Sequence, residues 1–226
     1  MSSEPTRDPV AADARDSAAG GPPGAWRIAL LVAAKDLRIE VHSRVLTNQV
    51  LPFAGVTMVI FAFALDADSV LQRVAPGLVW LATMFSLLVL VQRAFAVEAE
   101  DGALDAMRVA GVDARAIYLG KLLGLGVQLL VLEVVLLLAA VVLYSQTVPL
   151  EGVVLLVTTL ISATCGLAAV GTRYGGLAAG FRGRETVLPL LPLPAVAPVL
   201  LGATRAVEAA LGTAGAVVSD GWPWVG

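Results

Sequence analysis

The sequence has few charged residues and few of the side chains that carry catalysis or bind metals. Of its 226 residues, 15% are charged and 58% are hydrophobic, whereas soluble domains have about 25% charged and about 45–50% apolar residues. The single cysteine, Cys165, excludes a disulfide framework within one chain and a Cys-rich metal site. The chain also lacks GxxxxGK[ST], the loop that cradles nucleotide phosphates. Its net charge of −3, with scattered cations, argues against a nucleic-acid partner.

Five hydrophobic stretches are long enough to cross a bilayer. They lie at about residues 48–65, 74–96, 117–144, 150–171 and 186–204. A helix of about 20 apolar residues crosses a hydrocarbon core of about 30 Å, because each backbone group is hydrogen-bonded within the helix. The sequence therefore predicts an all-α protein, a polytopic transmembrane helix bundle of about five spans that occupies residues 26–226.

Positive charges lie almost entirely on one side of the predicted spans. Of the 15 Lys and Arg residues, 13 precede the first span, separate the second from the third, or separate the fourth from the fifth. Arg73 and Arg205 remain for the other side. Because cytoplasmic loops carry the excess of Lys and Arg, the N-terminus and the connections 92–116 and 172–185 are predicted to be cytoplasmic.

Two segments precede the first span. Residues 1–25 mix Pro, Gly, Ser and Asp without an apolar core, so they are predicted to be a disordered cytoplasmic tail and not a signal peptide. The apolar stretch Ile28 to Ala34 is too short to cross a membrane. An apolar stripe at helical spacing runs through it: Trp26, Leu30, Ala33, Leu37 and Val41. This pattern predicts an amphipathic helix lying in the membrane interface. The alternative is a continuation of the first span that packs against other helices.

The fifth predicted span is rich in proline. Pro189, Pro192, Pro194 and Pro198 each lack a backbone donor and clash with the preceding turn. This span is therefore predicted to be broken or kinked. Breaks of this kind occur in transport pathways and also in ordinary kinked helices.

The connection Gln92 to Ala116 is the longest predicted cytoplasmic segment. Its charged residues at steps of three, four and three share one helical face: Glu98, Asp101, Asp105 and Arg108. Gly102 lies within this segment and Gly111 closes it. Two interpretations follow from the periodicity. The segment is a short amphipathic helix with an acidic edge toward the cytoplasm, or it is an ordinary solvated loop.

Several short motifs occur in a fixed order along the chain. Pro-Gly-x-x-Trp opens the second span at Pro76, two acidic residues precede Gly-x-Leu at Glu100 to Leu104, and Gly120-Lys121 opens the third span. A Gly-rich turn and the Pro-rich span follow from Gly171 to Pro198. In order and spacing, this pattern resembles heme exporter protein B, the CcmB family. The resemblance covers about Trp26 to Trp224.

The resemblance implies a membrane permease subunit of an ABC-type heme exporter complex that acts in cytochrome c maturation in the bacterial plasma (inner) membrane. The family pattern has six spans with both termini in the cytoplasm. This chain stops at Asp220 to Gly226, where a sixth span would begin, so its C-terminus is expected outside. Two alternatives remain: an ABC-2-type exporter permease for another substrate, and a non-transporting membrane scaffold for release of a heme-loaded chaperone.

The resemblance also implies partners and a coupling site. The chain is not expected to be an enzyme, because ATP hydrolysis would belong to a separate ABC ATPase subunit. In ABC permeases a short loop helix docks on that ATPase, and the matching residues here are Glu98, Glu100, Asp101, Gly102, Leu104, Asp105, Met107 and Arg108. Further implied partners are a heme-handling membrane subunit, a second copy of the chain and lipid. Heme is expected as a transported or handled substrate, with no cofactor or metal assigned to this chain.

Two isolated ionisable residues remain. Glu133 lies in the middle of the third span, where a carboxylate is costly and by default a functional candidate that faces protein or water. The alternative is a protonated structural group bonded to a neighbouring helix. His42 is not expected to ligate heme iron, because the chain has no second histidine to pair with it.

Overall fold

The computed structural model of the chain describes residues 24–65, 68–100, 106, 109–178 and 192–225, and no strand occurs among them. The longer helices are α2 (Ala25–Ser43), α3 (Leu51–Ala64), α4 (Asp68–Glu100), α6 (Ala114–Leu143), α7 (Val153–Ala178) and α9 (Leu193–Leu211). The short elements are η1 (Leu46–Val50), η2 (Leu150–Gly152), η3 (Thr213–Gly215), α10 (Val218–Gly221) and η4 (Trp222–Trp224). The prediction of an all-α protein is confirmed. The predicted tail falls almost wholly outside the described residues.

Five helical stretches in the described part of the chain are long and apolar enough to cross a membrane. They are Leu46–Ala64, Ser69–Phe95, Ala114–Leu143, Leu150–Ala178 and Leu193–Leu211. The predicted number of spans is confirmed, and all five overlap the predicted ranges. The fifth runs from Leu193 to Leu211 in the described part of the chain, past the predicted end near residue 204.

Proline explains where the fifth span begins. Pro192 is the N-cap of α9 and Pro194 lies in its first turn, where a missing N–H costs no intrahelical hydrogen bond. Pro198 lies inside α9, and the helix continues through it to Leu211. The predicted break therefore does not occur within α9. Pro189 lies outside the described residues.

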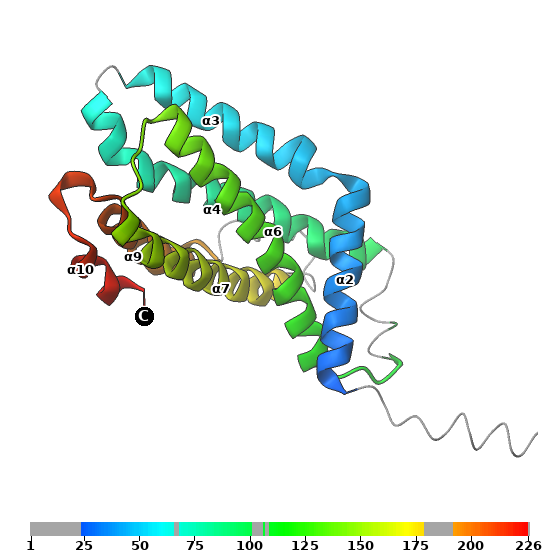
Figure 1. Cartoon of the computed structure of the whole chain (residues 1–226). Helices are drawn as coiled ribbons and strands as arrows, with labels where there is room; N and C mark the ends of the chain where they lie inside the picture. The colour runs from blue at the N-terminus through cyan, green and yellow to red at the C-terminus, as the bar shows by residue number, and fades with distance from the viewer. Residues whose placement is uncertain (1–23, 66–67, 101–105, 107–108, 179–191, 226) are drawn as a thin grey trace, which may run out of the picture.

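Helices α4, α6, α7 and α9 pack together to form the core of the bundle (Figure 1). Their largest buried side chains include Trp80 on α4, Leu129 on α6 and Leu155 on α7. Helix α3 lies at the edge of this core, where Met58 is buried but Phe63 is 83% exposed. In a bilayer the exposed apolar side chains of α3 would contact lipid, which is as apolar as they are.

The connection after α6 lies beside α3 and the first turns of α4 at one end of the bundle. The Tyr144 hydroxyl donates to the Met58 carbonyl at 2.9 Å, and Gln146 Nε2 donates to the Gln72 carbonyl at 2.8 Å. We call this end the Ser145 end. The opposite end, where α4 finishes at Glu100 and α6 begins, is the Glu100 end. The start of α4 and the end of α6, which the predicted topology places on the side opposite the connection 92–116, thus lie at the same end.

Helix α2 packs against the first turns of α6 at the side of the bundle (Figure 1). A Cβ atom added at Gly120 of α6 would lie 2.5 Å from the Val32 Cβ and 2.7 Å from the Ala29 carbonyl oxygen. One added at Gly124 would lie 3.3 Å from the Asp36 Cβ. These two glycines, four residues apart, allow the close backbone approach that small residues give helices in membranes.

The predicted N-terminal helix is present, but its apolar stripe is divided between two environments. Ala33 is buried against α6, whereas Trp26, Leu30 and Val41 are 59%, 47% and 71% exposed. Helix α2 therefore combines packing on the bundle with exposed apolar side chains. Its location in the membrane interface stays a prediction.

Candidate functional site

The predicted coupling segment follows directly from the end of α4. Glu98 and Glu100 lie in the last turn of α4, so the helix of the second span continues into the segment. The other predicted partner-binding residues lie outside the described part of the chain: Asp101, Gly102, Leu104, Asp105, Met107 and Arg108. Ala106 and Val109 are helical, and Gly111 adopts φ +72°, which ends a helix in the left-handed conformation that glycine favours. The closure predicted at Gly111 is therefore confirmed.

Lys121 joins three helices immediately beneath this segment. Its Nζ atom lies 3.0 Å from Asp36 Oδ2 on α2, donates to the Ala94 carbonyl on α4 at 3.0 Å and sits 5.4 Å from the centre of the Phe95 ring. The Lys121 side chain is 4% exposed and that of Asp36 is 11% exposed. We call Asp36, Ala94, Phe95 and Lys121 the Lys121 junction.

Phe95 extends the junction to a fourth helix. A Cβ atom added at Gly175 of α7 would lie 2.5 Å from the Phe95 ring, and one added at Gly171 would lie 2.8 Å from Val91 on α4. The absence of side chains at these two glycines lets α4 and α7 approach closely at the Glu100 end. Helices α2, α4, α6 and α7 are thus held together where the predicted coupling segment leaves the bundle.

Charge balance makes the junction sensitive to loss of either partner. Asp36 also lies 3.3 Å from Lys35 Nζ, whose side chain is 40% exposed. Removing two charges from water is costly, and a buried pair is stable only when the partners and further hydrogen bonds compensate each other. The Ala94 carbonyl and the Phe95 ring supply such additional contacts to the Lys121 ammonium.

Sequence reasoning did not identify this ion pair. Lys121 was part of the motif that opens the third span, and Asp36 follows the short apolar stretch Ile28 to Ala34. The two residues are far apart in sequence. The periodicity of one helix does not show which residue of another helix it contacts. Two features of the sequence could have suggested an ion pair: a cation at the start of an apolar span and an anion on the predicted amphipathic helix.

Glu133 points into the bundle, as predicted. It is fully buried between α6 and α7, where Thr164 Oγ1 donates to Glu133 Oε2 at 2.6 Å. Within the described residues, Glu133 Oε1 has no hydrogen-bond partner, and no cation forms an ion pair with this carboxyl group. The bond to a neighbouring helix matches the structural alternative for Glu133, and its functional role stays a prediction.

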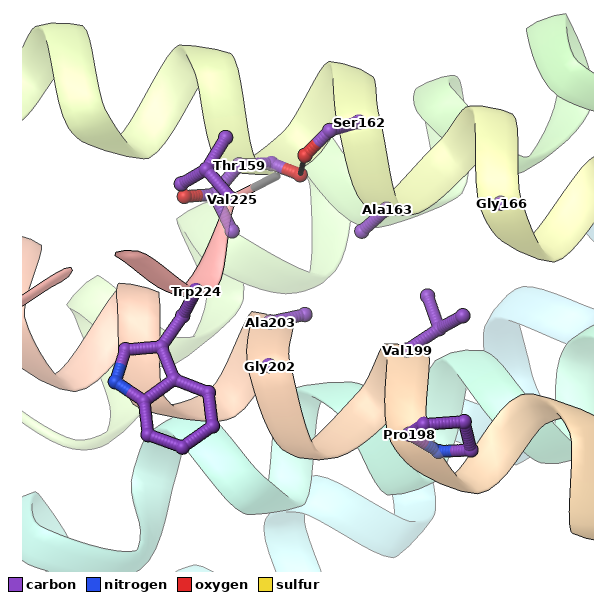
Figure 2. A pocket seen from close by; sticks show the side chains of 10 residues that line it. All are labelled: Thr159, Ser162, Ala163, Gly166, Pro198, Val199, Gly202, Ala203, Trp224 and Val225. Atoms are coloured by element: carbon purple, nitrogen blue, oxygen red, sulfur yellow. Dashed lines mark hydrogen bonds between the residues drawn. The ribbon is translucent and has the colours of Figure 1, made fainter. Parts of the chain in front are cut away.

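A groove lies between α7 and α9 (Figure 2). Its volume is about 310 Å³. Small residues of both helices form its floor, including Gly166 on α7 and Gly202 on α9. The end of the chain folds back over it, because the Trp224 carbonyl oxygen would lie 3.0 Å from a Cβ atom at Gly202. Figure 2 shows Val225 beside Thr159 at one end of this groove.

Potential metal ligands are dispersed in the described structure. No group of three His, Cys, Asp or Glu side chains able to hold a metal ion occurs among the residues searched. His42 is exposed on α2 and its Nδ1 donates to the Arg38 carbonyl at 2.9 Å. Cys165 is a free, exposed cysteine on α7.

Five apolar helices packed into one bundle define a multi-pass integral membrane protein. The comparisons with known proteins place it more closely. The family model described as CcmB protein matches residues 27–219, so the chain belongs to the CcmB family.

Three relatives illustrate this membership, and each is named heme exporter protein B. The protein of Paracoccus denitrificans is 30% identical over 191 residues, which are 83% of this chain and 84% of the relative. That of Rhodobacter capsulatus is 29% identical over 74% of this chain and 76% of the relative. That of Haemophilus influenzae is 28% identical over 81% and 82%, respectively. No solved structure matches the chain significantly.

Proposed function

We propose that the chain is the membrane permease subunit of an ABC-type heme exporter complex that acts in cytochrome c maturation. The observation that carries this proposal is the match of residues 27–219 to the CcmB family, with relatives named heme exporter protein B. The sequence has no phosphate-binding loop, so a separate ATPase subunit supplies the energy. Heme is the substrate in this proposal and not a resident cofactor.

The charge distribution supports an orientation with the N-terminus in the cytoplasm, and the bacterial plasma membrane is the proposed location. Exposed cations at the Glu100 end include Arg93, Arg115 and Arg173, whereas Arg73 and Arg205 lie toward the Ser145 end. Because Lys and Arg concentrate in cytoplasmic loops, the Glu100 end is the cytoplasmic end in this proposal.

The segment Glu98 to Arg108 is the proposed docking site for the ATPase. It follows the last turn of α4 and is closed by Gly111 before α6 begins. Its carboxylates would meet cations of the ATPase and set the orientation of the complex, since charges at the rim of an interface contribute mainly to specificity and association rate.

The Lys121 junction supplies a physical route from the docked segment into the bundle. Ala94 and Phe95 precede the segment on α4, and both contact Lys121 of α6. A displacement of α4 at this level must also move α2 through Asp36 and α7 through Gly175. Packed interfaces of this kind shift between discrete arrangements instead of deforming continuously. The remaining proposed partners are a heme-handling membrane subunit and a second copy of the chain.

The proposal is tested by charge reversal in the docking segment. Glu98, Asp101 and Asp105 are replaced together by Lys in a host that lacks the native gene. The matched control is Glu151→Lys, which reverses an exposed carboxylate near the Ser145 end. Membrane abundance, co-purification of the ATPase and covalent heme in c-type cytochromes are measured.

The triple variant should insert normally but lose the ATPase and most c-type cytochromes, while the control keeps both. Normal ATPase binding and normal cytochromes in the triple variant contradict the docking site. Normal cytochromes in the host without any copy of the gene contradict the proposed function. ATP-driven movement of heme into reconstituted vesicles separates a heme permease from a scaffold and from an exporter of another substrate.

A further inference from the structure

A polar cavity lies at the Ser145 end of the bundle, opposite the Lys121 junction. Its volume is about 310 Å³. It is bounded by the first turns of α4, the connection between α6 and η2, and the turn after α9. The polar residues that characterise it are Ser69, Gln72, Arg73, Ser145, Thr147 and Thr213. We call this cavity the Arg73 pocket.

Hydrogen bonds between its walls hold the pocket open. Gln72 Nε2 donates to the Ser145 carbonyl at 3.3 Å, and Gln146 Nε2 returns a bond to the Gln72 carbonyl at 2.8 Å. Gln146 is 7% exposed, so its side chain lies in the wall of the pocket, whereas the bond from Gln72 to Ser145 is exposed. Ser145 has φ +50°, a conformation uncommon for a residue other than glycine. The third wall is fixed by Thr213 Oγ1, which donates to the Glu208 carbonyl at 3.1 Å.

The described residues that line the pocket include one charged side chain, Arg73. Arg205 is paired with Glu208 at 3.0 Å. Arg73 forms no ion pair within the described structure, and none of the described residues that line the pocket is Asp or Glu. Its guanidinium group therefore offers its donors to whatever enters the cavity.

Hydroxyl groups add further donors. Ser69, Ser145 and Thr147 line the pocket, and their side chains make no hydrogen bond to other described residues. A guanidinium group with several free hydroxyls matches a carboxylate or phosphate, which accepts through several oxygens and forms the stronger, charge-assisted bonds.

We propose that the Arg73 pocket binds the carboxylate or phosphate group of an amphipathic ligand whose apolar body lies against the membrane-embedded surface of the bundle. The volume of about 310 Å³ lies at the lower end of the range of small-molecule sites, about 300–1,000 Å³, so the pocket has room for a propionate side chain or a phosphate group. Leu211 lines the pocket and also a separate apolar cavity of about 10 Å³, so apolar side chains lie directly behind this polar wall.

Two kinds of amphipathic ligand carry such an anionic group: heme, through its propionates, and a phospholipid, through its headgroup phosphate. The heme form rests on the proposed function, whereas the lipid form does not. A heme propionate held at the Ser145 end would place the substrate at the end opposite the proposed ATPase site.

The test uses the purified full chain in nanodiscs of zwitterionic lipid. Hemin and hemin dimethyl ester are titrated while tryptophan fluorescence is recorded, and native mass spectrometry counts the phospholipids that stay bound. Arg73→Gln removes the charge from the pocket. Arg205→Gln is the matched control, because it removes an arginine from the same end of the bundle but outside the pocket.

For heme as the ligand, Arg73→Gln should raise the Kd for hemin about tenfold, the loss expected for hydrogen bonds to one charged group. The control should leave the Kd unchanged, and the dimethyl ester should be insensitive to Arg73→Gln. Loss of one retained phospholipid in Arg73→Gln, with hemin binding unaffected, would support the site with lipid as its ligand and separate it from heme export. Unchanged hemin affinity together with an unchanged lipid count would overturn the proposal.

Discussion

Lys121 is the side chain whose removal is predicted to disturb the Glu100 end most. Replacing Lys121 by Met keeps the length of the side chain and its contact with Phe95 but leaves Asp36 without its nearer cation. Asp36 is only 11% exposed. Breaking a buried ion pair by removing one partner costs about 3–5 kcal/mol.

The remaining contact of Asp36 with Lys35 lowers the expected loss of stability. Lys35 Nζ lies 3.3 Å from Asp36 Oδ1 and remains in the variant, so we expect a loss of about 2–3 kcal/mol, below the full cost of an unpaired buried charge. At about 2–4 °C per kcal/mol for a chain of this size, the melting temperature should fall by about 5–10 °C. The measurement is thermal unfolding in detergent, followed by size-exclusion fluorescence.

Two matched variants make the test specific. Lys35→Met removes the more exposed cation beside the same carboxylate and should cost less than about 1 kcal/mol. The double variant Lys121→Met with Asp36→Leu removes both buried charges and should recover most of the lost stability. If the junction transmits motion from the docking segment, the double variant should remain low in cytochrome c maturation despite its recovered stability. Equal melting temperatures for Lys121→Met and wild type would refute the reasoning.

Three further outcomes are expected. In a variant in which Cys165 is replaced by Ser, a cysteine introduced at Ser145 should react with a membrane-impermeant reagent added to intact cells. A cysteine introduced at Ala103 should not react. Labelling at position 103 would contradict the predicted orientation. Gly120→Ala should destabilise the bundle by about 1–3 kcal/mol because its Cβ would lie 2.5 Å from the Val32 Cβ of α2. Gly126→Ala is the control and should be tolerated, because its nearest new contact is at 3.8 Å. Equal abundance and melting temperature for the two variants would contradict the close crossing of α2 and α6. Glu133→Gln should keep wild-type abundance on immunoblots, because the amide oxygen can accept the hydroxyl bond; lower cytochrome c maturation at unchanged abundance would assign this carboxyl group a transport role.

Much of the membrane architecture could be predicted from the sequence, because a bilayer requires each span to be a long apolar helix. Four spans were located closely on this basis. The fifth predicted range overlaps α9 but starts before it, because Leu and Val extend before Pro192 and hydropathy alone does not mark the start of α9. The positions of Pro192 and Pro194 at a helix start instead of a helix interior become evident only when the helix is seen.

The candidate site was only partly accessible to sequence reasoning. Glu133 could be predicted to face the bundle, since an unpaired carboxyl group in lipid is costly, and Gly111 could be predicted to end a helix. The pairing of Lys121 with Asp36 could not, because it depends on how two helices distant in sequence cross. The two polar ends of the bundle, the Lys121 junction and the Arg73 pocket, both arise from such crossings and connections.

The central claim is that a separate ATPase docks on the segment between α4 and α6. The most direct test inserts a photo-crosslinking amino acid at position 105 and, as a control, at position 145 in cells that produce c-type cytochromes, and identifies the crosslinked protein by mass spectrometry. Position 105 should crosslink to a protein with a GxxxxGK[ST] motif, and position 145 should not. An ATPase crosslinked from position 145, or none from any position across residues 98–108, would contradict it.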